Sequence, residues 1–84
     1  MTVEFTNHAL EEIRIREIDK QIIEAIIQNP KQILDSENNR KVYQDIVEFK
    51  NKKQYVVRVI IEETKGALRV VTAYKSSKIS KYWR

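Results

Sequence analysis

Cysteine is absent from this sequence of 84 residues, which excludes disulfide bonds and thiolate chemistry. With one histidine and no cluster of carboxylates at ligand spacing, no metal site is expected, and a single glycine cannot build a glycine-rich phosphate loop. No apolar run approaches the roughly 20 residues that span a bilayer, and no signal-peptide pattern opens the chain. We therefore expect a cytoplasmic protein that uses no metal or nucleotide cofactor and no membrane, with an exported protein without cysteines as the alternative.

The composition is that of one folded domain, with 42% hydrophobic and 33% charged residues, and we assign residues 1–84 to it. Charge is spread unevenly along the chain. Residues 1–30 carry six acidic and three basic side chains, whereas residues 31–84 carry six acidic and thirteen basic ones. This asymmetry predicts an anionic partner for the second half of the chain, and the alternative is a merely solvated, solubilising surface.

Apolar periodicity predicts two helices and then a run of strands, which is the order of an α+β domain. The first helix is capped by Thr6 or Asn7, and the second begins after Asp19 and ends at Asn29-Pro30. These helices are expected to cover the apolar face of a sheet. The segments with strand character are Thr2–Phe5, Gln32–Asp35, Lys41–Phe49, Gln54–Ile61 and Ala67–Lys75.

The last two of these strands form a hairpin at the centre of the predicted fold, and its turn holds the only glycine, Gly66. Pairing Ile61 with Leu68 sets the expected antiparallel register, in which Tyr55 lies opposite Tyr74 on the core side.

In that register, three basic side chains project together from the face opposite the core: Arg58, Arg69 and Lys75. A basic tail follows the hairpin, in which Lys78 and Lys81 accompany the apolar anchors Ile79, Tyr82 and Trp83. A sheet with a cationic second face is the feature from which we infer function.

Metal-free cleavage of RNA suits these side chains. The ribose 2′-hydroxyl attacks its own neighbouring phosphate, so the enzyme supplies a base, a cation for the phosphate and an acid for the leaving oxygen. His8 is the candidate acid or base, and the arginines and Lys75 are the candidates for the phosphate. Tyr74 and Trp83 are candidates for stacking on bases.

Each of these residues also has a simpler interpretation. A lone histidine near a helix start is commonly a surface or capping residue, and sheet arginines commonly pair with acids such as Asp45 or Glu62. A terminal Tyr-Trp pair is usually an anchor into a core or a partner.

The opening of the chain, from Phe5 to Ile18, resembles the opening of domain-of-unknown-function family 4258. That opening has a His-Ala pair, an arginine four positions after the histidine, a methionine, a second arginine four positions later, and an isoleucine. The matching residues are His8, Ala9, Arg16 and Ile18, whereas Ile13 replaces the methionine and Glu12 replaces the first arginine. Asn29-Pro30, Tyr43 and the run from Val70 to Tyr74 also resemble that family.

The resemblance implies a RelE/ParE-like toxin fold, in which two N-terminal helices pack on a curved antiparallel sheet of about four strands. It also implies His8, Arg16, Thr72 and Tyr74 as site positions. Together with the cationic face, it leads us to predict a toxin of a toxin–antitoxin pair that is a metal-independent endoribonuclease, with RNA (ribosome-bound mRNA included) and an acidic antitoxin as partners. The alternatives are a non-catalytic nucleic-acid- or protein-binding module of the same fold, including a gyrase-directed toxin of the ParE kind. The candidate catalytic residues are His8, Arg16, Arg58, Arg69 and Tyr74. The candidate substrate-binding residues are Thr72, Lys75, Lys78, Lys81 and Trp83.

Overall fold

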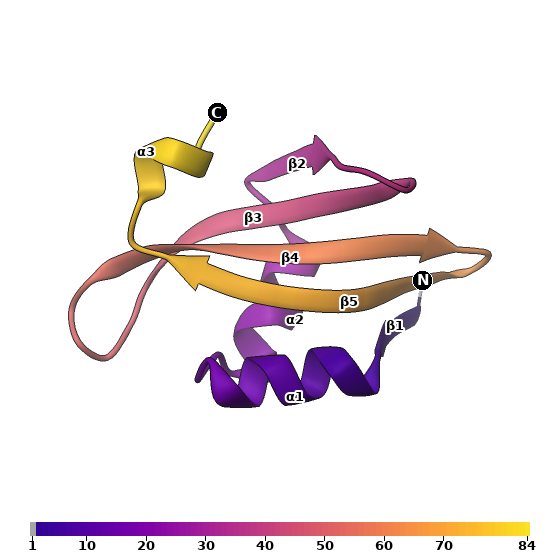
Figure 1. Ribbon diagram of the computed structural model, residues 1–84, viewed down its shortest axis with the longest axis horizontal. Coiled ribbons are helices and arrows are strands. Elements are labelled where there is room, and N and C mark those ends of the chain that lie inside the picture. Colours follow the sequence, from indigo (N-terminus) through magenta and orange to yellow (C-terminus); the bar gives the residue numbers. More distant parts are fainter. Residues whose placement is uncertain (1) are drawn as a thin grey trace.

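The computed structural model describes residues 2–84 and has an α+β architecture, as the order of the segments predicts. Five strands form one sheet in the order β1-β5-β4-β3-β2, as Figure 1 shows. The strands are β1 (Thr2–Phe5), β2 (Gln32–Asp35), β3 (Arg40–Glu48), β4 (Gln54–Thr64) and β5 (Ala67–Ser76). The helices are α1 (Asn7–Ile15), α2 (Lys20–Gln28) and the single turn α3 (Ile79–Tyr82).

The sheet has one strand more than the expected four, and it is not purely antiparallel. The N-terminal segment adds β1 beside β5, and the two strands run parallel, with Thr2 opposite Ala67 and Phe5 opposite Val70. The other three pairings are antiparallel. Beyond Phe5 the chain leaves the sheet, and α1 continues along the rest of β5 (Figure 1).

Both long helices begin where the sequence predicts, and α2 also ends there. The Thr6 hydroxyl accepts a hydrogen bond from the Ala9 amide at 3.0 Å and so caps α1, while Asp19 is the N-cap of α2. The helix α2 ends before Asn29-Pro30 because proline cannot continue it.

One face of the sheet, the helix side, holds the core. Residues of α1 and α2 pack there against alternate residues of the strands. The fully buried members of this core are Ala9, Ile23, Val57, Val59, Ile61, Val70 and Ala73. The expectation that the helices cover the apolar face of the sheet is therefore confirmed.

The expected register of the central hairpin is wrong. Its strands extend to a two-residue turn, Lys65-Gly66, where Gly66 has a φ of 79°. Ile61 therefore pairs with Val70 and not with Leu68.

A bulge at Val71 then shifts the remaining pairs, so that Ile60 lies opposite Thr72 and Arg58 opposite Tyr74. Because of this shift, Ala73 and Lys75 point to the helix side. Thr72 and Tyr74 point to the other face, which we call the second face.

Candidate functional site

Four polar side chains form a row across the second face. Gln32, Gln44, Arg58 and Tyr74 are consecutive register partners on β2, β3, β4 and β5. Gln44 Nε2 donates to Gln32 Oε1 at 2.7 Å, Arg58 Nε donates to Gln44 Oε1 at 2.9 Å, and Arg58 Nη1 donates to the Tyr74 hydroxyl at 2.6 Å. We call these four residues the polar row.

Arg58 is the charged member of the polar row, and its partners are neutral. It forms no ion pair with a carboxylate in the part of the chain that the structure describes. Its guanidinium carbon lies 4.5 Å from the ring centroid of Tyr82 and 5.7 Å from that of Tyr74. A guanidinium that is held in place but not neutralised is suited to binding an anion.

A second group of charged side chains lies where α1 borders β5. Glu12 Oε1 is 3.7 Å from His8 Nε2, and Glu12 Oε2 is 3.1 Å from Arg16 Nη2. Arg16 Nη1 donates to the Ala73 carbonyl at 2.7 Å and to the Thr72 hydroxyl at 3.4 Å. We call His8, Glu12 and Arg16 the rim group. They share one side of α1 because they are four residues apart.

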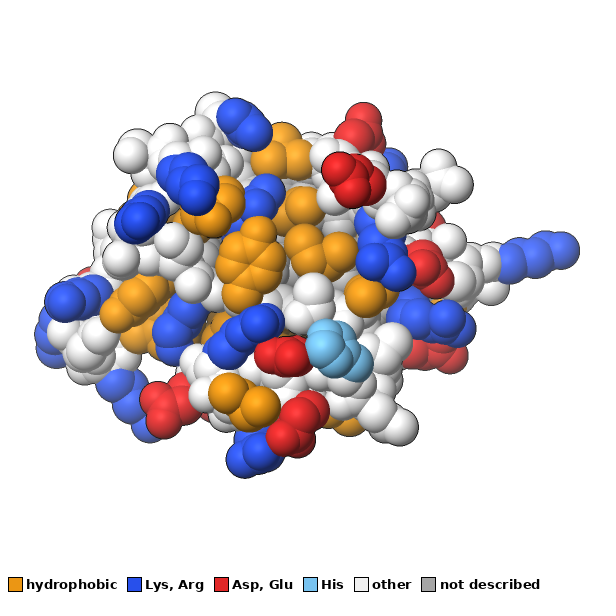
Figure 2. Space-filling view, viewed as in Figure 1, with side chains coloured by type: hydrophobic (Ala, Val, Ile, Leu, Met, Phe, Trp, Pro, Cys, Tyr) orange, Lys and Arg blue, Asp and Glu red, His pale blue; other side chains and the backbone are white. Residues whose placement is uncertain are grey.

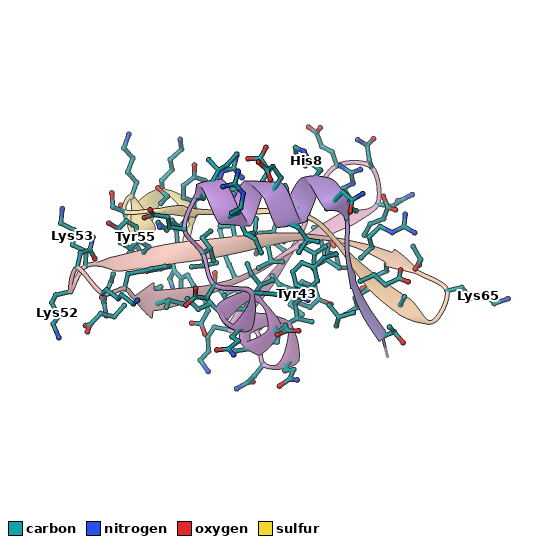
Figure 3. All side chains as sticks on the ribbon, turned by 90° about the horizontal axis from the view of Figure 1, so that it is seen from below. His8, Tyr43, Lys52, Lys53, Tyr55 and Lys65 are labelled. Atoms are coloured by element: carbon teal, nitrogen blue, oxygen red, sulfur yellow. The ribbon has the colours of Figure 1, made fainter. Side chains whose placement is uncertain are left out.

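The rim group lies at the border of the second face. Figure 2 shows the histidine there, next to acidic and basic side chains and below the hydrophobic side chains of the sheet. Seen from below in Figure 3, His8 points away from α2 and Tyr43 lies on the side of α2. Through Thr72, which lies on the same face as Tyr74, Arg16 connects the rim group to this face.

Lys75 does not join Arg58, contrary to the expected register. The bulge at Val71 turns Lys75 to the helix side, where its Nζ donates to the Arg16 carbonyl at 2.8 Å. The same ammonium group lies 4.6 Å from the ring centroid of Phe49. Lys75 thus binds the C-terminal end of α1, where the helix dipole favours a cation.

Arg69 is on the second face but at its far end. Its Nη1 lies 3.6 Å from Glu62 Oε1, and Arg40 Nε lies 3.5 Å from the other oxygen of the same carboxylate. The simpler interpretation, a sheet arginine paired with Glu62, is therefore correct for Arg69. The prediction that Arg58, Arg69 and Lys75 project together is wrong.

The remaining candidates belong to residues 77–84, which we call the C-terminal segment. Lys78 and Lys81 are exposed, and Lys81 Nζ lies 5.3 Å from the ring centroid of Tyr82. Trp83 is half-buried. The segment crosses from β5 toward β2, as Figure 1 shows, and basic side chains gather in that region of Figure 2.

Sequence reasoning missed Gln32 and Gln44 as members of this site. It also did not predict that Tyr82 contacts Arg58. Gln44 is 0% exposed, although it is polar. A signal for it was present, since Gln44 is the one polar side chain between Val42 and Ile46 on the same face of β3.

Residues 2–84 contain no group of three or more His, Cys, Asp or Glu side chains that could hold a metal ion. A cleft of about 740 Å³ opens on the helix side, between α1, α2 and the β3–β4 turn, and Lys75 and Phe49 contribute to its lining. None of the helices in the described residues has the length and apolar character required to cross a membrane.

Residues 5–75 match the model of a family described as a domain of unknown function, number 4258. This match includes the rim group and all of the polar row. No curated protein and no solved structure matches the chain.

Proposed function

Because the chain belongs to domain-of-unknown-function family 4258, as its match over residues 5–75 establishes, we propose an activity for it from its own site: metal-independent cleavage of RNA. The single observation that supports the proposal is Arg58. It is fixed by Gln44 and Tyr74 on the second face and has no carboxylate partner in residues 2–84.

In the proposed reaction, the ribose 2′-oxygen attacks the adjacent phosphorus and the bond from phosphorus to the 5′-oxygen breaks. The proton of the 2′-hydroxyl passes to a base, and the departing 5′-oxygen takes a proton from an acid. Arg58 binds the non-bridging phosphate oxygens, on which charge accumulates. His8 is the proposed proton carrier, with Glu12 within 3.7 Å of its Nε2.

The other candidate residues take supporting parts in this proposal. Arg16 and Thr72 border the phosphate site, where Arg16 Nη1 donates to the Thr72 hydroxyl at 3.4 Å. Tyr74 orients Arg58 through its hydroxyl. The exposed Lys78 and Lys81 attract the RNA backbone, and Trp83 offers a ring for stacking. Arg69 and Lys75 are left out, because Glu62 and the Arg16 carbonyl already bind them.

We also propose that the fold is of the RelE/ParE-like toxin kind and that an acidic antitoxin segment neutralises the site. The arrangement of α1 and α2 on one face of a largely antiparallel sheet supports the first part. The uncompensated Arg58 and the basic C-terminal segment support the second. Co-expression with any small acidic protein encoded beside this chain, followed by purification, tests the second part, since a stable complex that restores RNA integrity is expected.

The test of cleavage is incubation of purified protein with RNA in EDTA. We expect cleavage, and we expect Arg58→Ala to lower its rate by roughly a hundredfold or more, the usual effect of removing one charge-stabilising donor. Arg69→Ala is the matched control, because it removes a cation from the same face that Glu62 already neutralises. Absence of cleavage, or equal rates for the two variants, would refute the proposal.

Glu12 favours a second candidate function, RNA binding without cleavage. Its carboxylate lies beside both His8 and Arg16 and so neutralises part of the rim group. A binding module would show RNA affinity that falls steeply with salt while the RNA stays intact.

A further inference from the structure

The C-terminal segment is attached to the sheet through its main chain. Gln32 Nε2 donates to the Arg84 carbonyl at 2.7 Å, and the Arg84 amide donates to Gln32 Oε1 at 3.2 Å. Gln44 Nε2 donates to the Tyr82 carbonyl at 3.0 Å. Two members of the polar row therefore bind main-chain groups of the segment, and these hydrogen bonds do not depend on which side chains the segment carries.

The segment also covers Arg58. The ring of Tyr82 lies 4.5 Å from the guanidinium carbon, and Tyr74 contacts the same ring edge to face at 6.2 Å between centroids. Gln44 is fully buried beneath the segment. A phosphate that approaches Arg58 from this side must therefore displace Tyr82.

The attachment is weak for a folded element. The helix α3 has four residues, none of them buried, and its N-cap residue Lys78 makes no side-chain capping bond. The bonds from Gln32 and Gln44 to the main chain are neutral, and neutral hydrogen bonds exchange with water at small net cost. Such a segment belongs to the part of a protein that opens at low free energy.

We propose that the C-terminal segment is a removable cover of the polar row: bound to Gln32 and Gln44, it shields Arg58, and its release opens the row to single-stranded RNA. This inference rests on the proposed function only for the identity of the ligand. Opening frees the donor of the Gln44 amide together with Arg58, so a hydrogen-bonding group for a base lies beside a cation for a phosphate.

The chain carries its own reporter of the cover, since its single tryptophan, Trp83, lies in the segment. The test variant is Gln32→Ala, which removes the two hydrogen bonds to Arg84 and the one from Gln44 Nε2. The hydrogen bonds of Arg58 to Gln44 and Tyr74 do not involve Gln32. The matched control is Gln21→Ala, which changes an exposed glutamine of α2. Circular dichroism confirms that each variant is folded.

We expect acrylamide to quench Trp83 more in Gln32→Ala than in the wild type, toward the value for the urea-unfolded chain. We also expect Gln32→Ala to bind a 2′-O-methyl oligouridylate, which cannot be cleaved, up to roughly tenfold tighter, because two hydrogen bonds no longer hold the cover closed. Tyr82→Leu, which uncovers Arg58 while keeping the main-chain bonds, should also bind more tightly.

Three results would overturn the inference. Unchanged quenching in Gln32→Ala would mean that the amides do not hold the segment. Greater quenching with weaker or equal binding would mean that the segment forms part of the RNA-binding site and does not block it. Absence of binding by the opened variant would mean that the polar row is not a binding site for RNA. Tight binding of oligouridylate without cleavage of ordinary RNA would refute the proposed reaction alone and leave the cover standing.

Discussion

Arg58 donates a hydrogen bond from Nη1 to the Tyr74 hydroxyl over 2.6 Å, and the two residues are register partners on β4 and β5. The bulge at Val71 creates this pair. If β5 continued from Val70 without the extra residue, Tyr74 would face the helices and Arg58 would lie opposite Ala73. The bulge is thus what places an aromatic hydroxyl beside the cation of the second face.

Tyr74→Phe should loosen Arg58 while keeping the ring. The variant loses one hydrogen bond from a charged donor, so we expect a loss of about 1 kcal/mol in the free energy of unfolding. Binding of the 2′-O-methyl oligouridylate should weaken roughly threefold to tenfold, because the guanidinium is no longer held in one orientation. Urea titration and fluorescence anisotropy measure the two effects, and Tyr43→Phe on the helix side is the control. Unchanged binding in Tyr74→Phe would mean that the hydroxyl does not position Arg58.

Gln44→Leu should be among the most destabilising polar substitutions in the chain. It leaves Arg58 Nε without its acceptor and the Tyr82 carbonyl without its donor, and both groups face the site of Gln44, which is fully buried. We expect a loss of about 2 kcal/mol in the free energy of unfolding, the usual cost of unsatisfied buried polar groups. Urea titration checks this value, and Gln21→Leu on the exposed face of α2 should change it by less than about 0.5 kcal/mol. Equal stabilities of the two variants would contradict the importance of the polar row to the fold.

The periodicity of the sequence was sufficient to predict α1, α2 and the five strand segments, but it did not predict the single turn α3. The cap at Thr6, the end at Asn29-Pro30 and the edge strand Gln32–Asp35 all lie where local propensities place them. The parallel pairing of Thr2–Phe5 with β5 could not be predicted in this way, because it depends on where α1 packs and not on the strand's own residues.

The site was harder to predict than the elements. A bulge moves every later side chain in its strand to the opposite face of the sheet. Because the consecutive valines Val70 and Val71 fit either face, the alternation of apolar and polar residues does not show where the bulge lies. Lys75 and Tyr74 were assigned to the wrong faces for this reason. The position of the C-terminal segment depends on bonds from Gln32 and Gln44 to its main chain, which side-chain patterns do not reveal.

The pair Glu11–Arg14 predicts a local pH dependence. Arg14 donates to both carboxylate oxygens, at 2.6 Å and 3.2 Å. These hydrogen bonds, and then the charge of the guanidinium, hold the pKa of the Glu11 carboxyl below its ordinary value of 4.5. A lowered pKa in the folded state means that the stabilisation is present above the unfolded pKa and is lost as the pH falls through the folded value.

The test of this pair is an NMR titration of the Glu11 side-chain carboxyl carbon. We expect a midpoint below 4.5 in the wild type and a return toward 4.5 in Arg14→Gln. High salt should move the wild-type midpoint in the same direction, because the pair is exposed to solvent. A midpoint that neither Arg14→Gln nor salt changes would show that the pair does not persist in solution.

The side chain of Thr6 fixes α1 to the bulge, so Thr6→Ala should affect both. The Thr6 hydroxyl accepts from the Ala9 amide at 3.0 Å and donates to the Val71 carbonyl at 3.3 Å. Loss of an N-cap oxygen costs about 1 kcal/mol, and we expect Thr6→Ala to lower the free energy of unfolding by at least that amount. Thr6→Ser keeps the oxygen and should recover most of the loss, whereas Thr2→Ala on the exposed part of β1 should have little effect.

Urea titration measures these stabilities, and hydrogen exchange of the Ala9 amide reports the cap itself. Exchange at Ala9 should be faster in Thr6→Ala and close to wild type in Thr6→Ser. If Thr6→Ser were as unstable as Thr6→Ala, the methyl group would be the important part of the side chain. Packing of the methyl group would then connect the start of α1 to the bulge. The hydrogen bonds of Arg16 to Thr72 and Ala73 alone would hold the rim group beside Thr72.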